Sequence, residues 1–279
     1  MDSWRYYNHS AIPNTAPHII PNLEVIKSGK IWDMPGFPLL ARWTTDFDTN
    51  IETQWWYVIK DTPFDINALK AKRRYEINKG LGNFDVKRIV PMEHIESIYN
   101  VTVQAYSAWP EKYRPTVNHD SFVTNIETWQ DLVVYGAFSK IDGTLSGYAY
   151  LKVQGQCLDF SVLRTVPSCE RLGVNAAIVA TILNNEKSFL ENGNYICDGA
   201  RSMRHETAFQ DYLEKYFGFR KAYCTLNIKY RLGFGVIVKI LYPFRKILKK
   251  LTSIGLVSSI VAILSMEEII RTDMRTEIK

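Results

Sequence analysis

Three consecutive β-like runs in the middle of the chain constrain its fold more than any other feature. They read DLVVYGAFS, LSGYAYLKV and CLDFSVLRT, and they are separated by Asp142-Gly143 and by Gly155. Aromatic and β-branched residues favour strands, and glycine-containing turns join adjacent strands into hairpins. The runs therefore predict an antiparallel meander, and the helical patterns around them predict an α+β sheet flanked by helices.

The remaining elements follow from hydrophobic periodicity and from the residues that begin and end helices. We expect helices at 63–80, 91–108, 118–128, 173–193 and 205–218, and strands at 53–61, 84–90, 195–199 and 221–230. Pro63 near the start and Gly80 at the end delimit the first of these helices. The order of meander, crossover helix, strand, helix and strand places helices on both faces of a mostly antiparallel sheet.

Composition divides the chain into three predicted parts. Residues 1–62 are rich in proline and aromatic residues and predict an extended arm packed on the core. Residues 63–230 form the predicted α+β domain, and residues 231–279 a basic, apolar helical tail. The net charge of +5 arises in the C-terminal part, because ten basic and no acidic residues lie between Glu214 and Glu267. Such a block favours an anionic partner, which is a phospholipid, a phosphorylated ligand or RNA.

Cysteine spacing and the chain ends bear on the cellular compartment and on metal binding. The four cysteines include no CxxC pair, so we expect neither a zinc site nor a disulfide framework, and we interpret them as reduced, packed thiols. The N-terminus has an acid at Asp2 and no apolar run, which predicts a cytoplasmic protein. The uncharged run 254–266 is shorter than the roughly 20 residues of a membrane span. A buried helix and an interfacial helix both remain open for it.

A strand, a loop and a helix at CLDFSVLRTVPSCERLGVNAAIVATIL form the strongest local signal of a ligand site. A helix N-terminus presents free backbone N–H groups and the positive end of the helix dipole, which together bind phosphate. Gly173 permits close backbone approach, and Asn175-Ala176-Ala177 keeps side chains small there. A plain strand–helix connection has the same appearance, so both interpretations stand.

Residues 63–230 resemble the GNAT acyltransferase superfamily, and in particular its Fem-type aminoacyltransferase branch. The matching pieces are RYEINKG, GYAYLKV, CLDFSVL, ERLGVNAA and YLEKYFGFRK with its Gly218-Phe219 pair. The superfamily's pyrophosphate loop, Gln/Arg-x-x-Gly-x-Gly/Ala, is matched at Gly173, whereas Glu170 and Asn175 occupy its other positions. Glu214 stands where many members carry a tyrosine. Fem-type members lack the standard loop and fit these departures better.

The resemblance implies transfer of an acyl group from a thioester or ester donor to an amine or hydroxyl. A base removes the acceptor's proton, and a backbone N–H of the central strand polarises the carbonyl. The implied catalytic residues are Asp198, His205 and Glu206. The implied donor-binding residues are Leu163, Thr165, Gly173, Val174, Asn175 and Ala176, and the implied acceptor-binding residues are Asp159, Ser161, Arg201 and Arg204. Asp198 could instead cap the next helix or pair with Arg201.

An enzyme of the N-acyltransferase type is therefore expected, with acetyl-CoA, another acyl-CoA or aminoacyl-tRNA as donor. The expected acceptor is a small molecule, a glycan or a peptide, such as a cell-surface polysaccharide or peptidoglycan precursor. The basic residues of 66–80 form either a solvated face or a tRNA- or nucleotide-contacting patch. The alternative is a catalytically inactive GNAT-like binding module associated with a membrane or a partner protein. The tail either docks on an anionic membrane, which would make the protein peripheral, or packs on the domain.

Overall fold

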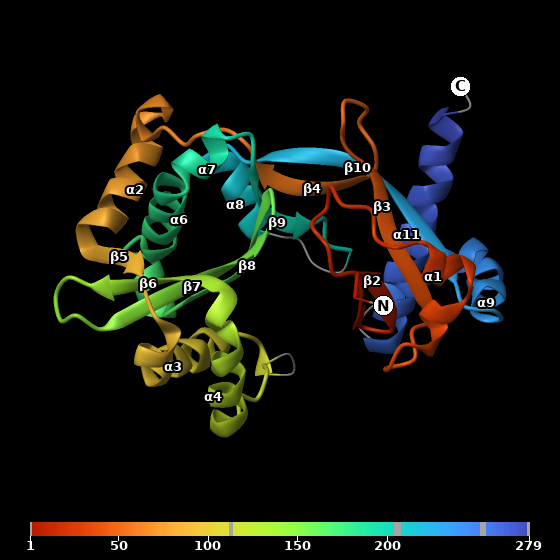
Figure 1. The fold of residues 1–279 in the computed structure, drawn as a ribbon, viewed down its shortest axis with the longest axis horizontal. Helices are drawn as coiled ribbons and strands as arrows, with labels where there is room; N and C mark the ends of the chain where they lie inside the picture. The colour runs from red at the N-terminus through yellow and green to blue at the C-terminus, as the bar shows by residue number, and fades with distance from the viewer. Residues whose placement is uncertain (1, 112–113, 204–207, 252–254, 278–279) are drawn as a thin grey trace. The chain divides into compact units, whose positions relative to one another are not determined.

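The computed structural model describes residues 2–111, 114–203, 208–251 and 255–277. The chain forms two compact units, each built from non-consecutive stretches (Figure 1). Unit 1 comprises residues 1–58, 200–208 and 221–279, and unit 2 comprises residues 59–199 and 209–220. Strands β4 (Trp55–Lys60) and β10 (Arg220–Tyr230) contribute residues to both units.

The sheet of unit 2 contains the predicted meander. Its neighbouring strands are, in order, β9 (Tyr195–Ala200), β8 (Cys157–Thr165), β7 (Leu145–Gln154), β6 (Leu132–Ser139) and β5 (Phe84–Arg88). The pairs from β5 to β8 are antiparallel, and β9 is parallel to β8. Gly143 and Gly155 turn the two hairpins with positive φ angles of 72° and 61°, which confirms the turns predicted at these glycines.

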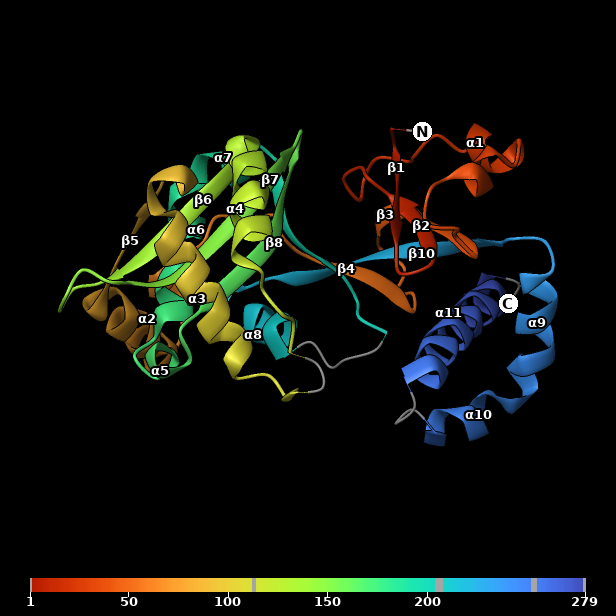
Figure 2. The same ribbon diagram turned by 90° about the horizontal axis from the view of Figure 1, so that it is seen from below.

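Helices cover both faces of this sheet (Figures 1 and 2). One face carries α2 (Ala71–Asn83) and α6 (Val174–Asn185), and the other carries α3 (Ile95–Ser107) and α4 (His119–Glu127). Helix α6 is mainly apolar, and eight of its twelve residues are buried. On the opposite face, Ile98 and Val101 of α3 pack on Trp129, Val134 and Tyr148. These contacts form the core and confirm the α+β, mostly antiparallel architecture.

The unit is completed by short elements and by one further helix. They are η2 (Ile66–Ala68), η3 (Pro91–His94), η5 (Thr128–Asp131), α5 (Pro167–Glu170), α7 (Lys187–Glu191) and α8 (Ala208–Phe217).

Two predicted helices have different limits in the structure. The helix expected at 63–80 begins only at Ala71, because the Asp65 side chain accepts a hydrogen bond from the Asn67 N–H and stabilises a separate 3-10 turn. It also continues through Gly80 to Asn83. The helix expected at 173–193 is two helices, α6 and α7, which are separated at the non-helical Glu186.

Unit 1 contains the other five strands. Its strands follow the order β1 (Trp4–Tyr7), β2 (Ser10–Pro13), β3 (Leu40–Thr49), β10 and β4. Strand β10 is antiparallel to β3 over seven residue pairs. Its helical elements are α1 (Glu24–Lys27), η1 (Lys30–Asp33), α9 (Phe234–Leu241), η6 (Tyr242–Phe244), α10 (Arg245–Leu248), η7 (Lys249–Leu251) and α11 (Gly255–Glu277).

The apolar run near the C-terminus belongs to a packed helix. Met266 and Ile269 of α11 share a core cluster with Trp55, Cys224 and Leu226 of the sheet. Ala262 and Leu264 of the run 254–266 are buried as well, which agrees with the buried-helix interpretation for this part of the run. Of the residues that the structure describes, none lies in a helix with enough length and apolar character to pass through a bilayer.

Candidate active site

Strands β8 and β9 of unit 2 separate after a short parallel pairing. Within the described residues, their parallel pairing covers only Cys157↔Tyr195, Leu158↔Ile196 and Asp159↔Cys197. Strand β8 continues for six residues beyond Asp159, and β9 continues through Asp198 to Ala200. The edge of β8 that faces β9 is therefore not paired with β9 along its C-terminal half.

A β-bulge lies in β8 at the point where the two strands separate. On the other edge of β8, the register with β7 runs from Leu151↔Phe160 directly to Tyr150↔Val162, so Ser161 is the extra residue. A bulge leaves one residue outside the ladder and bends the strand. Ser161 is exposed, and its hydroxyl donates a hydrogen bond of 2.9 Å to Oδ2 of Asp159. Two predicted acceptor-binding residues are thus brought together.

The predicted catalytic residue Asp198 follows the last paired residue of β9. Burial, together with the nearby charge of Asp159, raises the pKa of the Asp198 carboxyl to about 8. The amide Nε2 of Gln210 in α8 donates to the backbone carbonyl of Asp198 at 3.4 Å. A carboxyl with this pKa exchanges its proton near neutral pH, which is the property that general acid–base catalysis requires.

Helix α8 lines the same region with aromatic side chains. The ring of Phe209 meets Phe160 of β8 edge to face, with 5.8 Å between ring centroids, and lies 6.1 Å from Tyr212. Burial raises the pKa of Tyr212, so this phenol stays protonated. The aromatic residues give the region beside β8 an apolar wall, which lowers the local dielectric and strengthens electrostatic effects.

The start of α6 is held from two sides. The Thr165 hydroxyl at the end of β8 bonds to Oδ1 of Asn175 at 3.0 Å, which joins two predicted donor-binding residues. From α2, the Lys79 ammonium donates to the Arg171 carbonyl at 2.7 Å, and the Asn83 amide donates to the Leu172 carbonyl at 3.0 Å. Val174 and Ala176 are buried in the first turn.

Gly173 does permit a close backbone approach, and helix α2 is the segment that makes it. A Cβ added at Gly173, whose φ is +88°, would meet the Cα of Gly80 at 2.9 Å. The motif RYEINKG therefore positions the loop before α6 through Lys79 and Gly80. Its Ile77 is buried, as expected for a structural residue.

The other predicted site residues divide into three groups. Leu163 is partly buried on β8, within the stretch that has separated from β9. Arg201 belongs to unit 1, where its guanidinium stacks over Trp56 at 4.2 Å and donates to the Gln54 carbonyl at 2.5 Å. Arg204, His205 and Glu206 lie outside the described residues. The described residues contain no group of three or more His, Cys, Asp or Glu side chains able to hold a metal ion.

Sequence reasoning missed three contributors to this region: the bulge at Ser161, Gln210 and the Lys79–Asn83 clamp. The bulge is a property of pairing between strands and has no composition signal. Gln210 is a buried polar residue in a helix that otherwise follows an ordinary amphipathic pattern. Lys79 appeared only as part of a basic face.

A mostly antiparallel sheet that opens at one parallel strand pair, with a helix following the first of those strands, defines a GNAT-like fold. Solved structures support this class. The structure of FemX matches at a TM-score of 0.50 and 9% identity, over 78% of this chain and 81% of that chain. The structure of L-PGS from Bacillus licheniformis matches at a TM-score of 0.50 and 10% identity, over 85% of this chain and 83% of that chain. A conserved protein of unknown function from Bacteroides thetaiotaomicron VPI-5482 matches at a TM-score of 0.52 and 9% identity, over 82% of this chain and 83% of that chain.

These likenesses establish the fold. The chain has a GNAT-like fold, as the sequence resemblance predicted. No model of a known protein family matches the sequence, and no curated protein matches it.

Proposed function

We propose that the protein is an acyltransferase that moves an acetyl or aminoacyl group from an activated donor to an amine or hydroxyl. The observation that supports this most directly is the separation of β8 from β9 after Asp159, at the Ser161 bulge. A backbone N–H released from the ladder there would donate to the donor's carbonyl oxygen. Fixed backbone donors of this kind stabilise the negative charge that develops on that oxygen during acyl transfer.

Asp198 would carry the proton in this reaction. The acceptor nitrogen or oxygen attacks the carbonyl carbon and loses its proton to the Asp198 carboxylate, and the bond to the donor's sulfur or oxygen then breaks. The protonated carboxyl returns the proton to the leaving group. A pKa of about 8 suits both steps, because the two protonation states are then nearly equal in free energy.

The donor is an acyl-CoA or, alternatively, an aminoacyl-tRNA. Both have a phosphate-bearing nucleotide portion, for which the start of α6 would be the binding site. The Thr165–Asn175 hydrogen bond and the hydrogen bonds from Lys79 and Asn83 of α2 hold the first turn of α6 in place. A helix N-terminus that is fixed in this way binds phosphate. The acceptor class we propose is a sugar or peptide of a cell-surface polymer precursor.

Donor binding and transfer test this proposal separately. Acetyl-CoA, longer acyl-CoA species and aminoacyl-tRNA are each added to the full chain, and the melting temperature is measured, because a ligand bound by the native state raises it. The donor that raises the melting temperature is then assayed for loss of its acyl group in the presence of amine acceptors. We expect Asp198→Asn to retain donor binding and to slow transfer by about 100-fold or more.

A donor that binds but is never discharged would identify the protein as a GNAT-like binding module and overturn the enzymatic proposal. The absence of any melting shift with all three donors would overturn the proposed donor site as well.

A further inference from the structure

The segment that follows β10 exposes an unusual number of large apolar side chains. Leu232 is 100% exposed, and six others between residues 236 and 251 are 47% to 61% exposed. The six are Val236, Ile237, Ile240, Phe244, Ile247 and Leu251. They are spread over α9, η6, α10 and η7, so the exposed apolar side chains continue along the whole segment. An apolar run of this length on a surface marks an interaction site.

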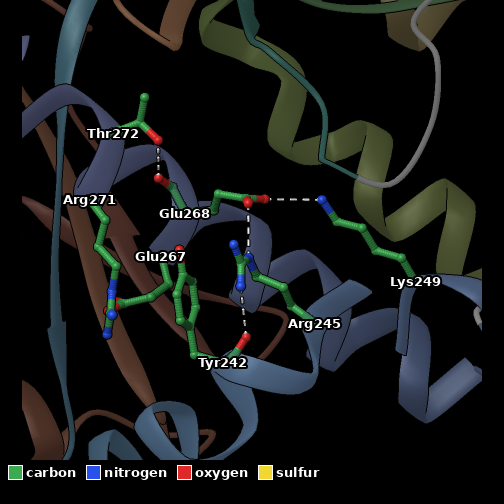
Figure 3. Close-up of polar contacts among 7 residues, drawn as sticks. All are labelled: Tyr242, Arg245, Lys249, Glu267, Glu268, Arg271 and Thr272. Carbon is green, nitrogen blue, oxygen red and sulfur yellow. Dashed lines mark hydrogen bonds and ion pairs between the residues drawn. The ribbon is translucent and has the colours of Figure 1, made fainter. Parts of the chain in front are cut away.

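Contacts with α11 fix the opposite side of this segment (Figure 3). Glu268 of α11 accepts from Nε of Arg245 at 2.9 Å and from Nζ of Lys249 at 3.1 Å. The hydrogen bond from Arg245, reinforced by the one from Lys249, holds the pKa of the Glu268 carboxyl below its usual value. The ring of Tyr242 contacts two guanidinium groups, those of Arg245 at 4.2 Å and Arg271 at 4.0 Å.

The same arrangement continues at the start of the segment. Val238 of α9 is buried. On α11, Glu267 accepts a hydrogen bond of 2.8 Å from Arg271, whose guanidinium contacts Tyr242 of the segment. The segment is therefore a fixed surface, attached through its polar and buried side, and its apolar face is turned to solvent.

Unpaired lysines accompany the apolar face. Lys239, Lys246 and Lys250 form no ion pair among the described residues, whereas Arg245 and Lys249 share the single carboxylate of Glu268. The sequence holds no acidic residue from Lys215 to Met266 that could offset them. The surface thus combines exposed apolar side chains with uncompensated positive charge.

We propose that residues 232–251 dock on the surface of a bilayer that contains anionic phospholipid. The apolar side chains would enter the boundary between headgroups and acyl chains, and the lysines would contact anionic headgroups. Long lysine side chains reach headgroups readily while their stems lie on apolar surface. A second copy of the chain is a poorer occupant, because it would bring the lysines of two copies together without an acid between them.

Vesicle binding of the full chain tests this proposal without any acyl donor. Phosphatidylcholine vesicles with and without phosphatidylglycerol are mixed with the protein and floated on a density gradient. We expect flotation with the anionic vesicles, weakened by salt, and little with phosphatidylcholine alone. The variant Lys239→Glu/Lys246→Glu/Lys250→Glu should bind roughly 100-fold more weakly, since each lysine contributes to attraction by the anionic surface.

A second variant tests the apolar contribution. Ile240→Glu/Ile247→Glu should abolish flotation, whereas Ile141→Glu, at a 90% exposed isoleucine of the β6–β7 turn, should leave it unchanged. Circular dichroism verifies that each variant is folded. Unchanged flotation of the Ile240→Glu/Ile247→Glu variant would overturn the proposal. A lipid-free dimer in sedimentation velocity that the same variant converts to monomer would also overturn it, since the face would then be an interface between copies.

Discussion

Gly80 of α2 and Gly173 at the start of α6 are in such close contact that a Cβ on Gly80 would lie 2.3 Å from the carbonyl oxygen of Gly173. No real Cβ approaches an oxygen so closely, and the neighbouring atoms are backbone, which cannot rotate away. The contact places the loop before α6 against α2, where Lys79 and Asn83 bind its carbonyls.

Gly80→Ala should therefore destabilise unit 2. We expect a loss of about 1–3 kcal/mol in the free energy of unfolding, the range for forcing extra volume into a packed site. Gly82→Ala is the matched control, because Gly82 lies in the same helix with nothing near its Cβ position. That variant should be neutral or more stable by up to about 1 kcal/mol, since alanine favours helix. Urea unfolding of the two variants compares them, and equal stabilities would contradict the close contact.

Asp198 should make stability depend on pH. Its pKa is about 8 in the folded chain against an ordinary 3.8, so the folded state binds more protons than the unfolded state between these values. The contribution of this group to stability is therefore largest at acidic pH and decreases as pH rises from about 4 to about 8. Asp198→Asn removes the titration. We expect the wild type to lose a few kcal/mol relative to the variant between about pH 5 and pH 9.

Chemical denaturation of both proteins at each pH gives the difference between their free energies of unfolding. Other titrating groups contribute equally to both proteins, so their contributions cancel in this difference. A difference that is constant with pH would mean that the Asp198 carboxyl has an ordinary pKa.

Two substitutions of Ser161 test whether its backbone N–H or its side chain contributes to acyl transfer. If the bulge acts through its backbone N–H, the acyl-transfer rate of Ser161→Ala should stay within a few fold of the wild-type rate. The substitution removes only the hydroxyl, whose hydrogen bonds go to Asp159. Ser161→Pro removes the N–H, and proline is tolerated at bulges. It should slow transfer by about 100-fold, the cost of one lost donor to the reacting oxygen. Equal rates for the two variants would exclude the backbone role.

Tyr135 should stabilise unit 2 through its hydroxyl. This tyrosine is fully buried, its hydroxyl donates to Oε1 of Glu186 at 2.7 Å, and it accepts from Nε of Arg88 at 3.0 Å. Tyr135→Phe leaves both partners without this bond, so we expect a loss of about 1–3 kcal/mol. Tyr75→Phe, at an exposed position of α2, should change the unfolding free energy by less than about 0.5 kcal/mol. Comparable effects at the two positions would contradict the buried network.

The elements of unit 2 could be predicted because their signals are local. Gly143 and Gly155 determine the hairpins, and the mainly apolar stretch from Val174 to Leu183 determines a buried helix. Glu186 illustrates the limit of such reasoning. Its side chain suits a helix, but its carboxylate binds Tyr135 from a distant strand, and the helix is interrupted there.

The site was predictable in its strands and less so in its geometry. Asp159, Ser161 and Asp198 were found because polar residues at the split of a GNAT-like sheet are conspicuous. The bulge that places Ser161 depends on the register between β7 and β8, which no single segment encodes. The domain limits at residues 62 and 230 stay a prediction, as do the roles of all the predicted site residues, including Asp159, Ser161 and Asp198.

Unit 1 is built from stretches that are far apart in the sequence, and this has a consequence for its folding during synthesis. Strand β3 leaves the ribosome early, but its antiparallel partner β10 is made only after nearly all of unit 2. Throughout that interval one edge of β3 is without its hydrogen-bonding partner, and an open edge invites pairing with other chains. A nascent chain that terminates before residue 220 would retain most of unit 2 and would permanently lack β10, the strand that pairs with β3.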